Sequence, residues 1–125
     1  MMNKLIKIFC NSCLVFLTSI SFVFAEENIS NTSWSISHDN GHEYVFQFNP
    51  DGTCPYFQKN SPSGNTGKIY DNCKWVRKNK VLVFEINNYH AVHIGIIEGR
   101  SMTGYFVSNH EVVNKSTFIG RRIDN

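Results

Sequence analysis

The chain has 125 residues, which leaves room for one domain only. Its formal net charge is +2, and removal of the N-terminal segment described below takes away Lys4 and Lys7 and leaves ten basic and ten acidic residues. A chain without net charge lacks the basic footprint of a nucleic-acid-binding protein, so we expect no nucleic acid partner.

The first 25 residues are typical of a secretory signal peptide. A basic start is followed by a mostly apolar stretch over residues 8–24, and Val23 and Ala25 suit positions −3 and −1 of a cleavage site. The alternative is an uncleaved membrane anchor, because the apolar stretch approaches the length that spans a bilayer. Its polar residues favour cleavage. We therefore expect residues 26–125 to be exported, to the periplasm or the medium, with no stable insertion into a membrane afterwards.

Cleavage would leave two of the four cysteines, Cys54 and Cys73. In an exported chain such a pair is most simply a disulfide, with metal ligation by two distant cysteines as the alternative. Closing a loop of this length stabilises a fold by roughly 3 kcal/mol in the chain-entropy account. The cross-link would matter because a single domain over residues 26–125 buries only a modest core.

Short β-rich runs then alternate with turn-forming residues along the rest of the chain. The expected strands cover residues 33–37, 44–48, 53–58, 68–76, 81–86, 91–96, 102–107 and 112–121. Asn40-Gly41 favours a tight hairpin between the first two strands. Pro55 has no N–H for a strand ladder, so it weakens the third strand or places it at an edge. The apolar-free stretch 59–67 is expected to be a loop.

No stretch has the periodicity of a helix, so the fold class is all-β. Eight short strands at this spacing form either a closed barrel or a sandwich. The uninterrupted succession of hairpins favours the barrel, because closure removes exposed sheet edges. We therefore predict an antiparallel up-and-down meander that closes into a small, eight-stranded barrel.

Alternation along the strands predicts which side chains face the inside of that barrel. Glu85 lies on the less apolar face of its strand and is expected to point outward, and we expect an outward His93 and a His90 at the barrel rim. Six apolar or aromatic side chains are candidates for facing a ligand in the interior: Phe46, Phe48, Leu82, Phe84, Ile94 and Tyr105.

Both ends of this region resemble the calycin superfamily, the lipocalin and avidin type of barrel. In these proteins a Gly-x-Trp motif opens the first strand, and an Arg late in the barrel packs across the tryptophan ring. Here Asn31-Thr32-Ser33-Trp34 stands at the start and Gly120-Arg121-Arg122 at the end. The resemblance implies a barrel closed by Trp34 and Arg121 through a cation–π contact worth about 0.5–2 kcal/mol. It implies no ligand, because no ligand-contacting set can be matched.

No residue pattern demands a cofactor or a metal. His38 and His42, with Asp39 between them, are compatible with Zn²⁺ or Cu²⁺, but no third or fourth ligand is fixed and a solvated turn explains the same residues. Ser108-Asn109-His110-Glu111 has residue types that hydrolases use, without a strained elbow or an oxyanion signal. We therefore expect no metal, no cofactor and no enzyme.

Two classes of function remain open. The first is a binder of a small, mainly apolar ligand, which predicts an interior too roomy for the protein's own side chains. The second is a protein-binding module, such as an exported inhibitor or immunity-type protein, which predicts a filled interior. The second would use the 59–67 loop or the 77–80 turn, where a cluster of cations would suit an acidic partner. That cluster consists of Lys74, Arg77, Lys78 and Lys80.

Overall fold

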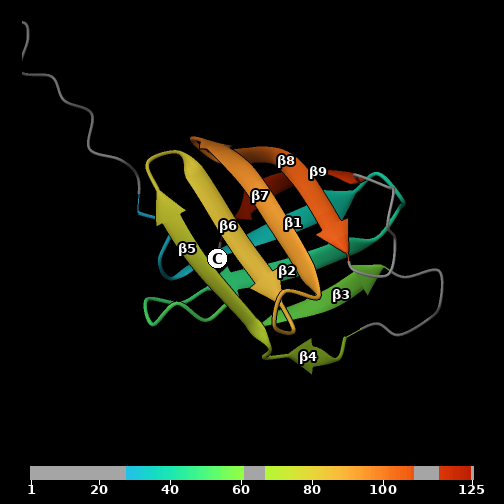
Figure 1. The fold of residues 1–125 in the computed structure, drawn as a ribbon. Coiled ribbons are helices and arrows are strands. Elements are labelled where there is room, and N and C mark those ends of the chain that lie inside the picture. The colour runs from blue at the N-terminus through green and yellow to red at the C-terminus, as the bar shows by residue number, and fades with distance from the viewer. Residues whose placement is uncertain (1–27, 61–66, 109–115, 125) are drawn as a thin grey trace, which may run out of the picture.

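The computed structural model describes residues 28–60, 67–108 and 116–124, and they form an antiparallel all-β barrel (Figure 1). The predicted signal peptide lies outside the described residues. The strands are β1 (Thr32–His38), β2 (Glu43–Phe48), β3 (Tyr56–Asn60), β4 (Ile69–Tyr70), β5 (Cys73–Lys78), β6 (Val81–Ile86), β7 (Ala91–Glu98), β8 (Ser101–Ser108) and β9 (Ser116–Ile123). No helix with the length and hydrophobicity of a membrane span occurs among the described residues.

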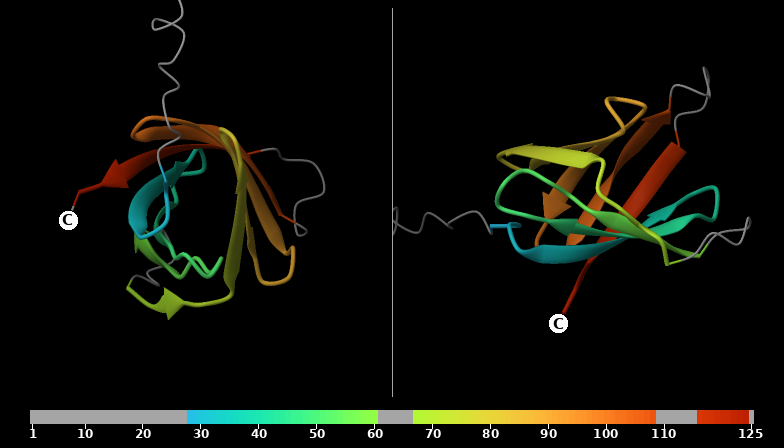
Figure 2. Two further views of the ribbon diagram at one scale, coloured as in Figure 1. Left: turned by 90° about the vertical axis from the view of Figure 1, so that its left-hand side faces the viewer. Right: turned by 90° about the horizontal axis from the view of Figure 1, so that it is seen from below.

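The strands form one sheet in the order β4-β3-β2-β1-β9-β8-β7-β6-β5, and every neighbouring pair is antiparallel. The first and last strands are therefore neighbours, and the sheet curls into a ring when viewed along its axis (Figure 2). This confirms the predicted meander and barrel. The structure has nine strands where eight were expected, because the run 68–76 divides at Asp71-Asn72. Its first part pairs with β3 and its second part pairs with β6.

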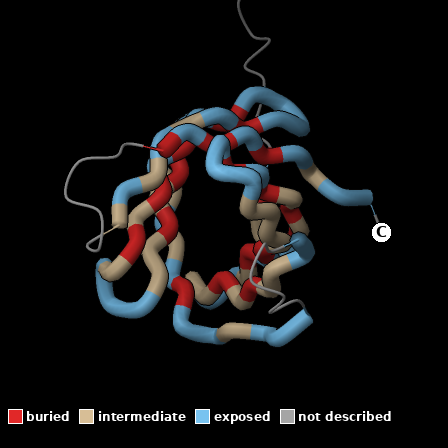
Figure 3. Tube along the Cα trace, turned by 90° about the vertical axis from the view of Figure 1, so that its right-hand side faces the viewer, coloured by how far each residue is buried: buried red, intermediate tan, exposed pale blue. Residues whose placement is uncertain are grey.

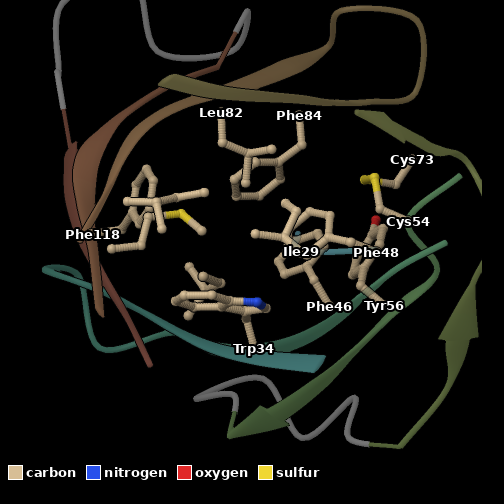
Figure 4. Packing of buried hydrophobic residues seen from close by; sticks show 13 residues of the cluster. Ile29, Trp34, Phe46, Phe48, Cys54, Tyr56, Cys73, Leu82, Phe84 and Phe118 are labelled. Carbon is tan, nitrogen blue, oxygen red and sulfur yellow. A yellow bond between two sulfur atoms is a disulfide. The ribbon is translucent and has the colours of Figure 1, made fainter. Parts of the chain in front are cut away.

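A short seam between β5 and the segment before β3 nearly completes the ring. Backbone N–H groups cross the seam from Cys54 to the Cys73 carbonyl and from Trp75 to the Gly52 carbonyl, both at 2.9 Å. The predicted disulfide Cys54–Cys73 is present at this point (Figure 4). Pro55 lies outside β3, as its missing N–H requires. The disulfide therefore links the two edges of the sheet at the seam, where few backbone hydrogen bonds join them.

Aromatic and aliphatic side chains fill the space inside the ring (Figure 4). Buried and exposed residues alternate along the strands, as expected for a wall with one dry face (Figure 3). The largest fully buried side chains, each less than 2% exposed, include Trp34, Ile36, Phe46, Phe48, Leu82, Phe84, Met102 and Phe118. The interior of the described barrel is therefore occupied by the protein's own side chains along much of its length.

The facing of β7 is opposite to the prediction. Ile94 is 46% exposed on the outside, whereas His93 is fully buried inside. The cause lies in the register with β6, which sets His93 directly opposite Phe84 and Gly95 directly opposite Leu82. Direct partners share one face of a sheet, so the inward residues of β6 fix the inward residues of β7.

Bulk explains why the smaller face of β7 points inward. A Cβ atom at Gly95 would lie 2.8 Å from Sδ of Met102 and 3.1 Å from Cζ of Phe118. The interior of a small barrel combines large and small residues, and here the small ones come from β7. The same alternation in β8 places Tyr105 outside, 57% exposed, so the prediction that it faces an interior ligand is also wrong.

Trp34 and Arg121 do not form the predicted closing pair. Trp34 is 1% exposed inside the barrel, and its indole N–H donates to Oγ1 of Thr32 at 2.9 Å. Its direct partner on β9 is Arg122, and Arg121 lies one residue away on the exposed outer face. The β1–β9 ladder itself closes this side of the barrel.

Candidate functional site

The two histidines that the sequence placed around one turn have different hydrogen-bond partners in the structure. His38 ends β1 with its side chain inside the barrel and only 8% exposed. His42 is half-buried, stacks on Tyr44 with centroids 6.2 Å apart, and has its Nδ1 2.7 Å from Nε2 of Gln58. The proposed ligand pair is therefore not assembled at the turn.

Asp39, the carboxylate of the same turn, is also engaged elsewhere. The backbone N–H of Thr117 donates to its Oδ2 at 3.0 Å, and this bond lowers the pKa of the carboxyl below its ordinary value. Among the described residues there is no group of three or more His, Cys, Asp or Glu side chains placed to hold a metal. The turn is thus a structural anchor between β1 and β9.

The partner of His38 inside the barrel is His93, from the middle of β7. The two Nε2 atoms lie 2.9 Å apart, which is a hydrogen-bond distance. The ring centroids are 5.0 Å apart with 23° between the ring planes. The distance between the ring centroids exceeds the distance between the two Nε2 atoms by roughly the diameter of one ring. The imidazoles therefore lie end to end. Residues 55 positions apart in the chain therefore share one buried hydrogen bond.

Aromatic rings enclose this pair. Phe84 stacks on His93 with centroids 4.3 Å apart and 8° between planes. Phe106 contacts both imidazoles, at 4.8 Å from His38 and 4.7 Å from His93. The other rings in contact are Tyr44, Phe46 and Phe118. We call the two histidines and these five rings the histidine cluster.

Burial keeps both imidazoles uncharged. Loss of hydration is the main cause that lowers the pKa of His38 to about 4, and the nearby His42 acts in the same direction. Burial likewise holds the pKa of His93 well below its ordinary value, with a further contribution from His38. The pair therefore holds neutral rings at pH 7, with one N–H between the two Nε2 atoms.

The second nitrogen of His93 decides which ring donates. Its Nδ1 is buried and makes no hydrogen bond of acceptable geometry, although the backbone carbonyl of Phe84 lies close enough to oppose the fall in pKa. Orphaned buried N–H groups are rarer in folded proteins than under-satisfied acceptors. The favoured tautomer therefore carries its proton on Nε2 of His93, which donates to Nε2 of His38.

A second candidate surface lies on the outside of the same strands. Two rows of direct partners cross it, Val83–Ile94–Tyr105–Thr117 and Val81–Ile96–Thr103–Ile119. We define the outer apolar face by six of its exposed large side chains: Val81, Ile94, Ile96, Tyr105, Val107 and Ile119. Three neighbouring strands, β7, β8 and β9, carry five of them side by side (Figure 1).

A hollow of about 410 Å³ opens on this face, lined by Ile94, Ile96, Thr103, Gly104, Tyr105, Thr117, Phe118 and Ile119. Gly104 lets the two central strands approach closely here. A Cβ atom at Gly104 would lie 2.0 Å from the carbonyl oxygen of Ile94 and 2.8 Å from Cα of Gly95. The hollow is therefore shaped by backbone, which gives it a fixed position between the exposed apolar side chains.

Cations flank one end of the outer apolar face. Lys78 is the direct partner of Val81, and Lys80 lies at the turn that follows β5. Arg121 is exposed on β9, two residues beyond Ile119. Glu98, at the end of β7, is exposed near the same end. The flank is positive, and it includes two members of the cation cluster that the sequence indicated.

The remaining predicted residues separate into three groups. Phe46, Phe48, Leu82 and Phe84 are fully buried inside the barrel, so a role in contacting a ligand stays a prediction. Glu85 is half-buried on the face opposite Phe84, as expected, and its Oε2 accepts the Tyr89 backbone N–H at 2.6 Å. Most of the 59–67 loop and the His110-Glu111 pair lie outside the described residues.

Sequence reasoning missed both candidate sites because it assigned the more apolar face of β7 to the interior. The usable signal was the small face of the strand. Ala91 and Gly95 share that face with His93, and small residues fit against the bulky inward pair Leu82 and Phe84.

Comparison with known proteins supports the fold alone. No family model matches the chain, and no curated protein matches its sequence. Among solved structures, it is similar to the one described as a "putative beta-lactamase from Burkholderia vietnamiensis", with a TM-score of 0.53 and 10% sequence identity. The match covers 79% of this chain and 99% of that chain. The chain is thus a small, nearly closed antiparallel β-barrel with a disulfide that is compatible with export.

Proposed function

We propose that this protein is an exported, non-enzymatic protein-binding module that contacts its partner through the outer apolar face. The observation that carries the proposal is the gathering of six large apolar side chains, each 39–57% exposed, on one face. Contiguous exposed apolar surface on a soluble domain marks an interaction site, whereas single exposed residues do not. The hollow over Gly104 offers a pocket for one anchoring side chain of the partner.

The filled interior supports this reading over a ligand-binding barrel. Phe46, Phe48, Leu82 and Phe84 pack against one another and against Trp34 with almost no exposed surface. A ligand among them would have to displace aromatic side chains that already bury each other. The outer apolar face needs no such rearrangement.

Charge indicates the chemistry of the partner. The cations Lys78, Lys80 and Arg121 flank the apolar residues, with Glu98 and the Arg100–Asp124 ion pair at the same end of the sheet. A second copy would present the same positive flank and so offers no complementary charge to it. A different protein, with apolar side chains bordered by acidic residues, fits better than a second copy.

The wider setting of the proposal is export to the periplasm or the medium, with the calycin superfamily as a distant structural relation. The name of the Burkholderia vietnamiensis protein describes that protein. For this chain, no group of three or more His, Cys, Asp or Glu side chains among the described residues is placed to hold a metal ion. The exposed features are those of a contact surface.

Site-specific photo-crosslinking in the native host tests the proposal. A photoreactive side chain replaces Tyr105 in the outer apolar face or, as the matched control, Ile69 on β4. Ile69 is also apolar, is 72% exposed, and borders a separate hollow of about 210 Å³. We expect one discrete adduct from Tyr105, carrying a protein other than this chain, and none from Ile69.

A second pair of substitutions tests whether the Tyr105 adduct is lost when the outer apolar face is changed. Ile96→Glu should abolish the Tyr105 adduct, because it places a charge in the apolar centre, and Ile69→Glu should leave it unchanged. An adduct from Ile69 alone, or an adduct that contains only a second copy of this chain, would overturn the proposal.

A further inference from the structure

The histidine cluster holds two convergent nitrogen ligands that the protein-binding surface does not use. Nε2 of His38 and Nε2 of His93 point at each other along one line, 2.9 Å apart, inside the barrel. Imidazoles are costly occupants of an apolar interior, where a phenylalanine would fill similar space without a polar group to satisfy. The unpartnered Nδ1 of His93, on a fully buried side chain, is a second sign that the hydrogen-bonded pair is incomplete.

We infer that His38 and His93 form a two-coordinate site for a monovalent soft cation of the Cu⁺ or Ag⁺ type. Each Nε2 atom contributes one lone pair, and the ion takes the place of the proton between the rings. That proton moves from Nε2 to the empty Nδ1 of His93, so the pair remains neutral and no proton is released at neutral pH. Nδ1 of His93 has no hydrogen-bond partner now, so binding also requires the ring to turn until the relocated N–H reaches the Phe84 backbone carbonyl.

The change of geometry that binding requires is small. Metal–imidazole bonds are about 2 Å long, so two in-line bonds need the nitrogens about 4 Å apart, roughly 1 Å more than now. The end-to-end arrangement of the rings lets this separation grow along the nitrogen–nitrogen axis. Flat contacts with Phe84 and Phe106 allow each imidazole to slide without leaving its neighbours.

The ligand set selects the charge and softness of the ion. Zn²⁺ requires four ligands and Ca²⁺ requires six or more oxygens, and the described residues contain no larger ligand group. Imidazole suits copper, and a single positive charge is the least expensive one to bury. Phe46 and Phe118 meet the His93 ring in T-shaped contacts, with centroids 5.7 Å and 5.3 Å away, and an aromatic ring whose face meets a cation attracts it.

Access to the site is from the barrel end at which β1 finishes. His38 retains 8% exposure there, and the neighbouring rings of Tyr44 and Phe106 are only partly buried. His93 is fully buried behind them. An ion entering from solvent therefore meets His38 first.

Titration of the disulfide-intact exported protein with Ag⁺, and with Cu⁺ under anaerobic conditions, tests the inference. Competition against a chelator gives the stoichiometry and the affinity. We expect one ion per chain, and a loss of affinity of more than about 100-fold in His38→Phe and in His93→Phe. The matched controls His42→Ala and His90→Ala, which change histidines outside the pair, should bind as the parent does.

X-ray absorption of the loaded parent protein provides a readout that does not depend on how the variants fold. Two nitrogen neighbours and no sulfur neighbour are expected. Equal affinities in all four variants, the absence of one-to-one binding, or sulfur in the coordination sphere would each overturn the inference and leave a purely structural histidine pair.

Discussion

At the scale of single residues, two uncharged imidazoles inside an aromatic barrel link folding to pH. His38 has its pKa lowered to about 4 in the folded state, against an ordinary value of 6.5, and burial holds the pKa of His93 well below that ordinary value too. Between those values the unfolded chain binds more protons than the folded chain. The stability that the neutral pair contributes is therefore complete above about pH 6.5 and is lost as the pH falls toward 4.

We predict that the free energy of unfolding decreases between pH 7 and pH 4.5, by up to about 1.4 kcal/mol per pH unit for each histidine that gains a proton on unfolding. Urea denaturation at several pH values measures this slope. His93→Phe should flatten the curve, because one of the two imidazoles is then absent in both states. An unchanged slope in that variant would mean that the pair does not set the pH dependence.

A second prediction at this scale concerns Gly104, where β7 and β8 approach closely. Gly104→Ala directs a Cβ atom into the backbone of Ile94, which cannot move without separating β7 from β8. Gly95→Ala meets the flexible Met102 side chain first, so part of its strain can be relieved. We expect Gly104→Ala to cost about 3 kcal/mol or more, at or above the upper end of the usual range for overpacking, and Gly95→Ala to cost less. Urea denaturation of both variants provides the comparison, and equal costs would contradict the account.

At the scale of elements, the strands and turns were predictable because they depend on local patterns. The turn at Asn40-Gly41 and the break at Pro55 lie where those residues predict them. The facing of β7 was not predictable from the strand alone, since Ile94 and Ile96 make its outer face the more apolar one. Only the register with Leu82 and Phe84 on β6 determines that facing, and register is a property of a strand pair.

Closure of the barrel at β1 and β9 depends on backbone pairing and on the buried ring of Trp34. We predict that Trp34→Ala destabilises the fold by about 3–5 kcal/mol, because it removes a large side chain from a filled interior. Arg121→Ala should change stability by less than about 0.5 kcal/mol, because Arg121 lies on the exposed outer face. Thermal and urea unfolding of both variants measure the difference. A large effect of Arg121→Ala would restore the cation–π closure that the resemblance to calycins implies.

At the scale of the whole molecule, the barrel is a single curved sheet whose two edges meet at a short seam. Backbone bonds at Gly52 and Cys54 and the Cys54–Cys73 disulfide join those edges. The disulfide could be predicted from the count of cysteines and the expected export. The seam that it closes could not, because it depends on the division of the run 68–76 into two strands.

The double variant Cys54→Ala/Cys73→Ala should lose about 3 kcal/mol of stability, as expected for a loop of this length in the chain-entropy account. The bridged cysteines are 19 positions apart, and both are buried. Denaturation of the variant beside the oxidised parent measures the loss. A loss below about 1 kcal/mol would mean that the strand ladder alone holds the seam.

The candidate sites show why function was harder to predict than fold. Both depend on side chains brought together by register: His38 with His93 inside the barrel, and Ile94 with Tyr105 outside it. Each of these pairs joins residues from different strands. The sequence marked His38 and its neighbour His42 as candidate ligands of one metal ion, because a sequence shows only local spacing.

Native mass spectrometry of the mature protein, recovered from its own exported compartment, tests the central claim most directly. We expect the chain to be recovered with a second, different protein bound in a defined stoichiometry, and the Ile96→Glu variant to be recovered without it. No small organic molecule should accompany either form. An apolar organic mass that stays with the folded parent and leaves on denaturation would contradict the account and identify the barrel as a ligand carrier.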